Sequence, residues 1–251
     1  MSPKCQSVIS SLNSSTTIAY SKSTSIAIQL RNSKNFGQQC RCHSRSSRLC
    51  PCHVQTFSYV PVLPDSFLGG SAPRLRYFHL DAVQFLRLPK LLLSSTHLVC
   101  LYLQRIPHSG YISPETMATC LSMLTSLMDL RLEFESPESS PDQEGRRSPS
   151  ITCSVLPDLT YFSFKGVNEY LEDFVARIDA PQLYYFPVTF FNDLDFDTPE
   201  LIRFVSRSLR RPEAPIKAHV SFDSQTASVE LRPQASGIRH FSVNILCREP
   251  G

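Results

Sequence analysis

A short pattern of apolar side chains, L-x-x-L-x-L, recurs along the chain and restricts its fold more than any other feature. Its spacing of three and then two residues fits neither an amphipathic helix nor a strictly alternating strand. Five copies begin 23, 29, 32 and 24 residues apart. They are Leu75, Phe78 and Leu80; Leu98, Leu101 and Leu103; Leu127, Leu130 and Leu132; Leu159, Phe162 and Phe164; and Leu183, Phe186 and Val188, with a more distant sixth copy at Ile238, Phe241 and Val243.

A repeat of this length with one strand per unit is typical of leucine-rich repeats. We expect the last two apolar residues of each copy to lie on a short strand and face the core, while the first closes the preceding turn. Each buried large side chain contributes roughly 1.5–3 kcal/mol, whereas ordering the backbone costs roughly 1–2 kcal/mol per residue. One unit therefore cannot fold alone, and neighbouring units must stack.

The segments between the copies predict helices, which makes the fold class α/β. Ser113 is placed as an N-cap and Pro114 suits a first helical position. We therefore expect an irregular leucine-rich-repeat solenoid, with parallel strands on one face and helices on the other. The residues expected to face the strands are Met117, Cys120, Leu121 and Leu124; then Tyr170, Leu171, Phe174, Val175 and Ile178, in a helix capped by Asn168; then Leu201, Ile202 and Val205, in a helix opened by Thr198 and Pro199; a shorter helix is expected from Pro89.

Composition divides the chain into two parts. No Asp or Glu precedes Asp65, and the same stretch carries seven Lys and Arg and many Ser. We interpret residues 1–56 as a disordered, basic, Ser-rich tail and residues 57–251 as the repeat domain. Within that domain, residues 136–150 are rich in Pro and Ser without apolar periodicity, which predicts a disordered loop. Pro187 removes one backbone donor from the fifth strand, so weaker pairing is expected there.

The tail carries two alternative functions. The motif C-x-C-H occurs twice, at Cys40, Cys42 and His43 and at Cys50, Cys52 and His53. Zinc takes four such ligands, but its usual spacing is C-x₂₋₄-C and the flanks offer few apolar residues. We therefore favour incidental thiols and predict no metal or cofactor, with zinc binding as an alternative. The acid-free composition also fits mitochondrial targeting.

Several functional classes lack their sequence signatures. There is no glycine-rich nucleotide loop, G-x-S-x-G elbow or H-E-x-x-H motif. The basic residues are too dispersed for nucleic-acid binding, and no apolar run reaches the roughly 18 residues that suggest a membrane span. Nine cysteines without an export signal predict a reduced, cytoplasmic or nuclear protein. A Cys100–His79 pair is the one catalytic arrangement to consider, and we predict that the protein is not an enzyme.

Strand periodicity identifies candidate binding residues, because side chains next to the inward pair point to the opposite face. Tyr and Arg anchor many protein interfaces, although Tyr is also favoured by β-propensity. The sequence thus predicts recognition of an unidentified protein through the concave strand face. The candidate residues are Tyr77, His79, Asp81, Tyr102, Gln104, Asp129, Arg131, Glu133, Tyr161, Lys165 and Tyr185, with Cys100, Ser163 and Thr189 on the same face.

Longer phrases carry a family resemblance. The segments "LPDLTYFSFKGVNEYLEDFVARIDAPQL" and "FDTPELIRFVSR", with the region around "APRLRYFHLDAVQF", resemble the F-box-like leucine-rich-repeat proteins of basidiomycete fungi over about residues 57–249. The resemblance implies repeats that select a substrate for a ubiquitin ligase. Residues 1–56 show no F-box-like run, so contact with the ligase core is expected only if an F-box lies upstream. A truncated, non-functional gene product is a further alternative.

Overall fold

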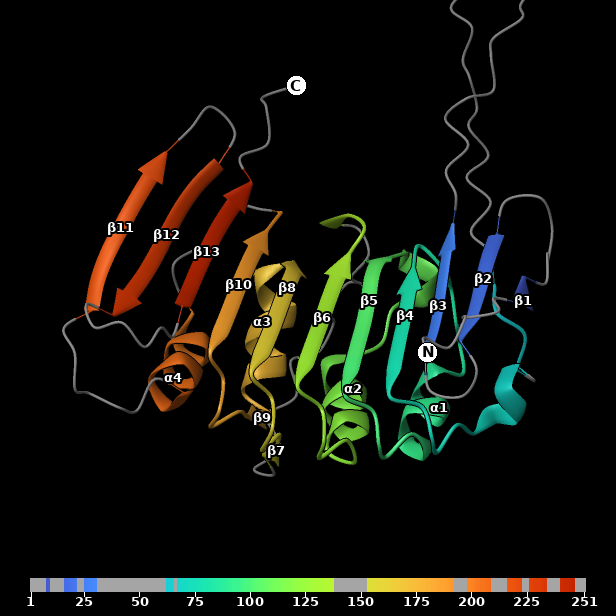
Figure 1. Cartoon of the computed structure of the whole chain (residues 1–251). Coiled ribbons are helices and arrows are strands. Elements are labelled where there is room, and N and C mark those ends of the chain that lie inside the picture. The colour runs from blue at the N-terminus through green and yellow to red at the C-terminus, as the bar shows by residue number, and fades with distance from the viewer. Residues whose placement is uncertain are drawn as a thin grey trace, which may run out of the picture.

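Every copy of the repeat contributes a strand to one mixed sheet (Figure 1). The structure, a computed structural model, describes residues 8–9, 16–21, 25–30, 62–65, 67–137, 153–191, 198–208, 216–222, 226–233 and 240–246. The strands of this sheet are β1 (Val8–Ile9), β2 (Thr16–Ser21), β3 (Ser25–Leu30), β4 (Tyr77–Asp81), β5 (Cys100–Ile106), β6 (Asp129–Phe134), β8 (Tyr161–Gly166), β10 (Tyr185–Phe190), β11 (Ile216–Phe222), β12 (Thr226–Pro233) and β13 (His240–Leu246).

Parallel pairing dominates the sheet. Its spatial order is β1-β2-β3-β4-β5-β6-β8-β10-β13-β12-β11, and the strands from β3 to β13 in this order run parallel. Antiparallel strands extend it at both ends. A separate pair, β7 (Ser154–Val155) and β9 (Ile178–Asp179), lies below the sheet in the view of Figure 1.

The strand register aligns the apolar residues of successive copies. Leu101 pairs with Phe78 on one side and with Leu130 on the other, and all three are buried. The distant sixth copy keeps this register, because Phe241 pairs with Phe186. The expectation that the last two apolar residues of each copy lie on a strand and face the core is confirmed for the first five copies. Their buried pairs are Phe78 and Leu80, Leu101 and Leu103, Leu130 and Leu132, Phe162 and Phe164, and Phe186 and Val188.

The described residues form four α-helices, which cover one face of the sheet from β4 to β10 (Figure 1). They are α1 (Leu88–Ser94), α2 (Pro114–Leu121), α3 (Asn168–Val175) and α4 (Pro199–Ser208), with short 3-10 turns at Phe67–Gly70 and His108–Gly110. Each helix contacts the next along the chain. None of these helices has the length and apolar character needed to cross a membrane. The described residues therefore form a mixed α/β structure whose sheet is parallel at its centre and antiparallel at both ends.

The helix predictions hold at α2 and fail in detail at α3 and α4. Ser113 caps α2 by accepting a hydrogen bond from the backbone N–H of Thr116 at 3.2 Å. Asn168 is not a cap but the first residue of α3, which begins without a side-chain cap. The prediction that Ile202 faces the core is wrong, because it is 61% exposed, whereas Phe204 is buried. Leu201, three residues before Phe204, completes the buried stripe.

Part of the predicted tail belongs to the sheet. β1, β2 and β3 all fall within residues 1–56, and β3 pairs in parallel with β4, with Ile28 opposite Leu80. The prediction of disorder is therefore wrong for these strands. Ile18 and Tyr20, and then Ile26 and Ile28, are spaced two residues apart, which is the period of a strand. The many Ser and Thr residues around them make this period hard to recognise in the sequence. The rest of residues 1–56, including both C-x-C-H motifs, lies outside the described residues.

Two further predictions, at Pro187 and at the loop 136–150, can be compared with the structure. The ladder between β8 and β10 pairs Tyr185 with Tyr161 and resumes only at Val188 with Phe164, so pairing is interrupted at Pro187 as expected. The backbone of β10 pairs without a gap with β13 on its other side. Of the loop predicted at 136–150, the structure describes residues 136 and 137; residues 138–150 lie outside the described ranges.

Truncating a buried leucine on β6, in the middle of the sheet, should destabilise the whole sheet. Leu130 on β6 is fully buried, so Leu130→Ala should lower the free energy of unfolding by about 2–5 kcal/mol. The matched control is Met128→Ala, because Met128, two residues earlier, is 46% exposed; its effect should stay within about 0.5 kcal/mol. Urea denaturation measures both. Equal effects of the two substitutions would contradict the assigned core.

Pairing between β3 and β4 predicts a difference in hydrogen exchange. In a chain that begins at residue 57, the β4 amides that bond to β3 lose their acceptors and should exchange faster than in the full chain. The amides of β6 serve as an internal control, because two other strands flank β6. Equal protection of Tyr77–Asp81 in both chains would show that β3 does not pair with β4.

Candidate functional site

The alternating residues of β4, β5, β6, β8 and β10 form the sheet face opposite the helices, which we call the open face. Side chains on this face are half-buried, whereas their neighbours along each strand are buried against the helices. Ten of the eleven predicted binding residues lie half-buried on it: Tyr77, His79, Tyr102, Gln104, Asp129, Arg131, Glu133, Tyr161, Lys165 and Tyr185. The exception is Asp81, which is buried.

Five of these side chains make a continuous series of ring contacts across the open face. We call Tyr77, Tyr102, Arg131, Tyr161 and Tyr185 the tyrosine–arginine row. The rings of the first two meet edge to face with centroids 5.2 Å apart. The Arg131 guanidinium lies 4.4 Å from the Tyr102 centroid and 4.9 Å from that of Tyr161. Tyr161 stacks on Tyr185 at 5.1 Å. The row thus spans β4, β5, β6, β8 and β10.

Asp129 holds the centre of the row in place. The Tyr102 hydroxyl donates a hydrogen bond of 2.5 Å to Asp129 Oδ2. Arg131 Nε lies 3.5 Å from Asp129 Oδ1, an ion pair in which neither atom makes a hydrogen bond to a described residue. Burial, followed by the bond to Asp129, raises the pKa of Tyr102 well above its usual value of 10.0. Burial likewise raises the pKa values of Tyr77 and Tyr161.

A second set of polar contacts runs beside the row, toward the carboxyl ends of the strands. His79 Nε2 lies 2.8 Å from Gln104 Oε1. The Gln104 amide in turn donates to Glu133 Oε1 at 3.3 Å, so its carbonyl oxygen is the atom that accepts from the imidazole. Lys165 takes no part in this chain, because its ammonium lies 5.3 Å above the ring of Phe191. The strand register therefore brings His79, Gln104 and Glu133 together and leaves Lys165 apart.

Asp81 was predicted to contact a partner, and the structure places it elsewhere. Its side chain is only 8% exposed, and Oδ1 accepts a 2.5 Å hydrogen bond from Arg105 Nε. The register of β5 and β6 shifts between Leu103 and Ile106, and Arg105 has a φ of 48°. Such an irregularity redirects a side chain. Arg105 is thus the polar residue that sequence reasoning missed, since no motif marks a left-handed Arg.

The catalytic arrangement considered from the sequence does not form. Cys100 stands opposite Tyr77, whereas His79 stands opposite Tyr102 and bonds to Gln104. Burial, and then the charge of Asp129, raise the pKa of the Cys100 thiol. Because the thiolate is the nucleophile, this environment opposes reactivity. Among the described residues, no group of three or more His, Cys, Asp or Glu is placed to hold a metal ion.

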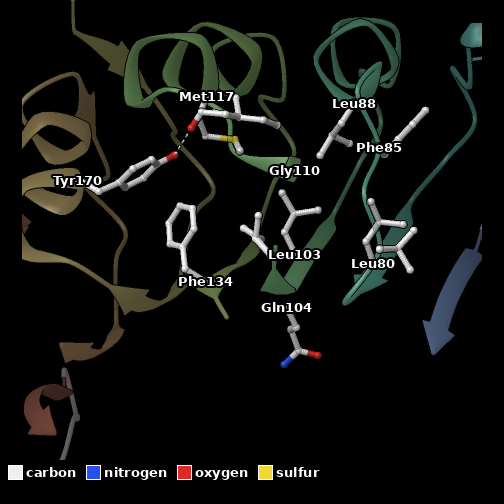
Figure 2. Close-up of a pocket in the computed structure, with 12 residues that line it drawn as sticks. Leu80, Phe85, Leu88, Leu103, Gln104, Gly110, Met117, Phe134 and Tyr170 are labelled. Carbon is white, nitrogen blue, oxygen red and sulfur yellow. Dashed lines mark hydrogen bonds between the residues drawn. The ribbon is translucent and has the colours of Figure 1, made fainter. Parts of the chain in front are cut away.

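A small cavity lies on the helix side of the sheet. Figure 2 shows its lining, which includes Leu103, Met117, Phe134 and Tyr170, mostly apolar side chains from the sheet, α2 and α3. The Tyr170 hydroxyl is satisfied by the Ile112 carbonyl at 3.1 Å, the dashed line in the figure. The volume of about 20 Å³ holds roughly one water molecule. This cavity is therefore a packing space rather than a ligand site.

No protein-family model, curated protein sequence or solved structure matches the chain. The functional argument below therefore depends on the geometry of the open face.

The raised pKa of Tyr102 predicts a loss of stability at high pH. The folded chain favours the protonated phenol, so this contribution is fully present below pH 10, the usual pKa, and is lost as the pH rises through the higher folded value. Tyr102→Phe should flatten the fall of the urea midpoint above pH 10. The control is Tyr184→Phe. Tyr184 is an exposed tyrosine immediately before β10, and its substitution should leave the fall unchanged. Identical pH profiles for Tyr102→Phe and the parent chain would contradict the assignment.

Proposed function

We propose that the protein is a non-enzymatic recognition module that binds a protein partner on its open face. The observation that carries the proposal is the tyrosine–arginine row, which crosses five parallel strands without a break. We further propose that the stacked units are irregular leucine-rich repeats in a solenoid. The common register of the apolar pairs and the succession of neighbouring helices support that architecture.

The composition of the row suits protein recognition. Tyr and Arg dominate the energetics of many interfaces, because they offer large contact areas with few rotatable bonds or with several directed donors. Here each member of the row contacts its neighbours before any partner arrives. Side chains that are already ordered lose less conformational entropy on binding. A broad face of this kind favours a macromolecular partner over a small ligand, for which pockets of about 300 Å³ or more are usual.

The nature of the partner is proposed from the family resemblance. By that resemblance, the open face selects a protein substrate for ubiquitination, and contact with the ligase core would require an F-box supplied upstream. An enzymatic role is disfavoured by the separation of Cys100 from His79 and by the raised pKa of the thiol. The open-face proposal does not depend on the ubiquitin-ligase assignment and can be tested separately.

Comparative affinity capture tests the open face. The full chain, Tyr161→Ala and the control Ile202→Ala are used as baits in one cell extract, and the bound proteins are quantified by mass spectrometry. Tyr161→Ala removes a ring that contacts both Arg131 and Tyr185, so it should weaken a true partner by about 1–3 kcal/mol. Ile202 is exposed on α4, on the helix side, and its truncation should leave the same partner unchanged.

Circular dichroism and the urea midpoint establish that both variants remain folded. A partner that binds Tyr161→Ala as tightly as the parent chain, or that is lost only with Ile202→Ala, would show that the open face is not the binding surface.

A further inference from the structure

The Arg131 guanidinium lies between the rings of two tyrosines on the neighbouring strands. Its central carbon lies 4.4 Å from the centroid of Tyr102 and 4.9 Å from the centroid of Tyr161, which comes from the strand on the other side. The contacts Tyr77–Tyr102 and Tyr161–Tyr185 support these two rings from outside. A guanidinium held in this way has little rotational freedom.

The Arg131 guanidinium has unused hydrogen-bonding capacity. A guanidinium has five N–H donors, and all lie in its plane. Nε faces Asp129 Oδ1 at 3.5 Å without forming a hydrogen bond, and Asp129 Oδ2 is already occupied by the Tyr102 hydroxyl. The described residues offer the terminal Nη groups no acceptor. The side chain is nevertheless 34% exposed, so an acceptor can arrive from outside the protein.

We infer that the open face, in the role proposed above, selects protein partners that present the carboxylate of an Asp or Glu side chain to the edge of Arg131. A carboxylate has two oxygens in one plane and matches two parallel N–H donors of a guanidinium. Because the guanidinium lies between two rings, these rings also limit the directions from which the carboxylate can approach. The inference rests on the proposed function, and the test below separates the failure of one from the failure of the other.

The charges around Arg131 disfavour a doubly charged anion more than a singly charged one. Asp129 is its neighbour at 3.5 Å, and Glu133 lies on the same face two residues along β6. Lys165, the other cation near this position, lies over Phe191 instead of beside Arg131. A phosphate with two negative charges would meet both acidic side chains with only one guanidinium to offset them. A carboxylate carries half that charge, and the open face therefore suits an acidic peptide better than a phosphorylated one.

Peptide selection on the full chain tests the inference. A random library of 12-residue peptides is selected on the parent protein, and the affinities of the enriched peptides are measured. We expect one position to be enriched in Asp or Glu, and Arg131→Gln to weaken these peptides about tenfold or more. Changing the peptide's acidic residue to its amide should cause little further loss in Arg131→Gln, because both changes remove the same contact. Arg203→Gln, at an exposed arginine of α4, is the matched control and should change nothing.

A second variant should bind the acidic peptides more tightly, a result that misfolding would not produce. Asp129→Asn removes the carboxylate that competes for Arg131, and its side-chain oxygen can still accept from Tyr102. The acidic peptides should bind this variant several-fold more tightly than the parent. Weaker binding to Asp129→Asn, with the fold intact, would overturn the inference.

The remaining outcomes separate the two claims. Peptides that need Tyr161 but bind Arg131→Gln normally, or that bind better with phosphoserine in place of their acidic residue, overturn the carboxylate inference and leave the open face as the binding surface. If the selected peptides bind Tyr161→Ala and Arg131→Gln as tightly as the parent, both the inference and the proposed function are wrong.

Discussion

The in-register stacking of buried side chains between neighbouring strands is the interaction on which the rest of the structure depends. Phe78, Leu101, Leu130 and Phe162 stand side by side on β4, β5, β6 and β8, and Phe162 stacks on Phe186 with ring centroids 4.8 Å apart. No single unit buries enough apolar surface to offset the entropy of ordering its residues. The units become stable because the buried side chains of each unit pack against those of its two neighbours. A shift of one residue would turn every buried side chain toward the open face.

The register that builds the core also orders the open face. Since side chains alternate along a strand, aligning one set of residues aligns the other. Tyr102 therefore stands directly opposite Arg131, while Asp129 stands between Cys100 and Tyr161 on the neighbouring strands. The central hydrogen bond and both guanidinium contacts follow from this alignment. Core packing therefore sets the positions of the side chains on the proposed recognition surface. The chemistry of that surface depends on which residues occupy the outward positions.

The parts of this arrangement that depend on local periodicity could be predicted from the sequence. The apolar pairs, the Ser113 cap and the row of outward residues all follow from spacing along the chain. The parts that depend on distant contacts could not. β3, which lies in the Ser-rich N-terminal part of the chain, pairs with β4, and the left-handed Arg105 turns back to Asp81 at an irregular point of β5. Asp81 fits the outward period yet is buried by that contact, so periodicity identified its strand and misjudged its role.

The claim that the register fixes the row is tested most directly by a double-mutant cycle on stability. Arg131→Met and Tyr161→Leu each remove one partner of the cation–π contact and retain apolar volume. The account predicts a coupling energy of about 0.5–2 kcal/mol for this pair. A second cycle, with Tyr77→Leu and Tyr185→Leu at opposite ends of the row, should be additive within about 0.5 kcal/mol. A coupling near zero between Arg131 and Tyr161 would contradict the account, because the two residues would then not meet across β6 and β8.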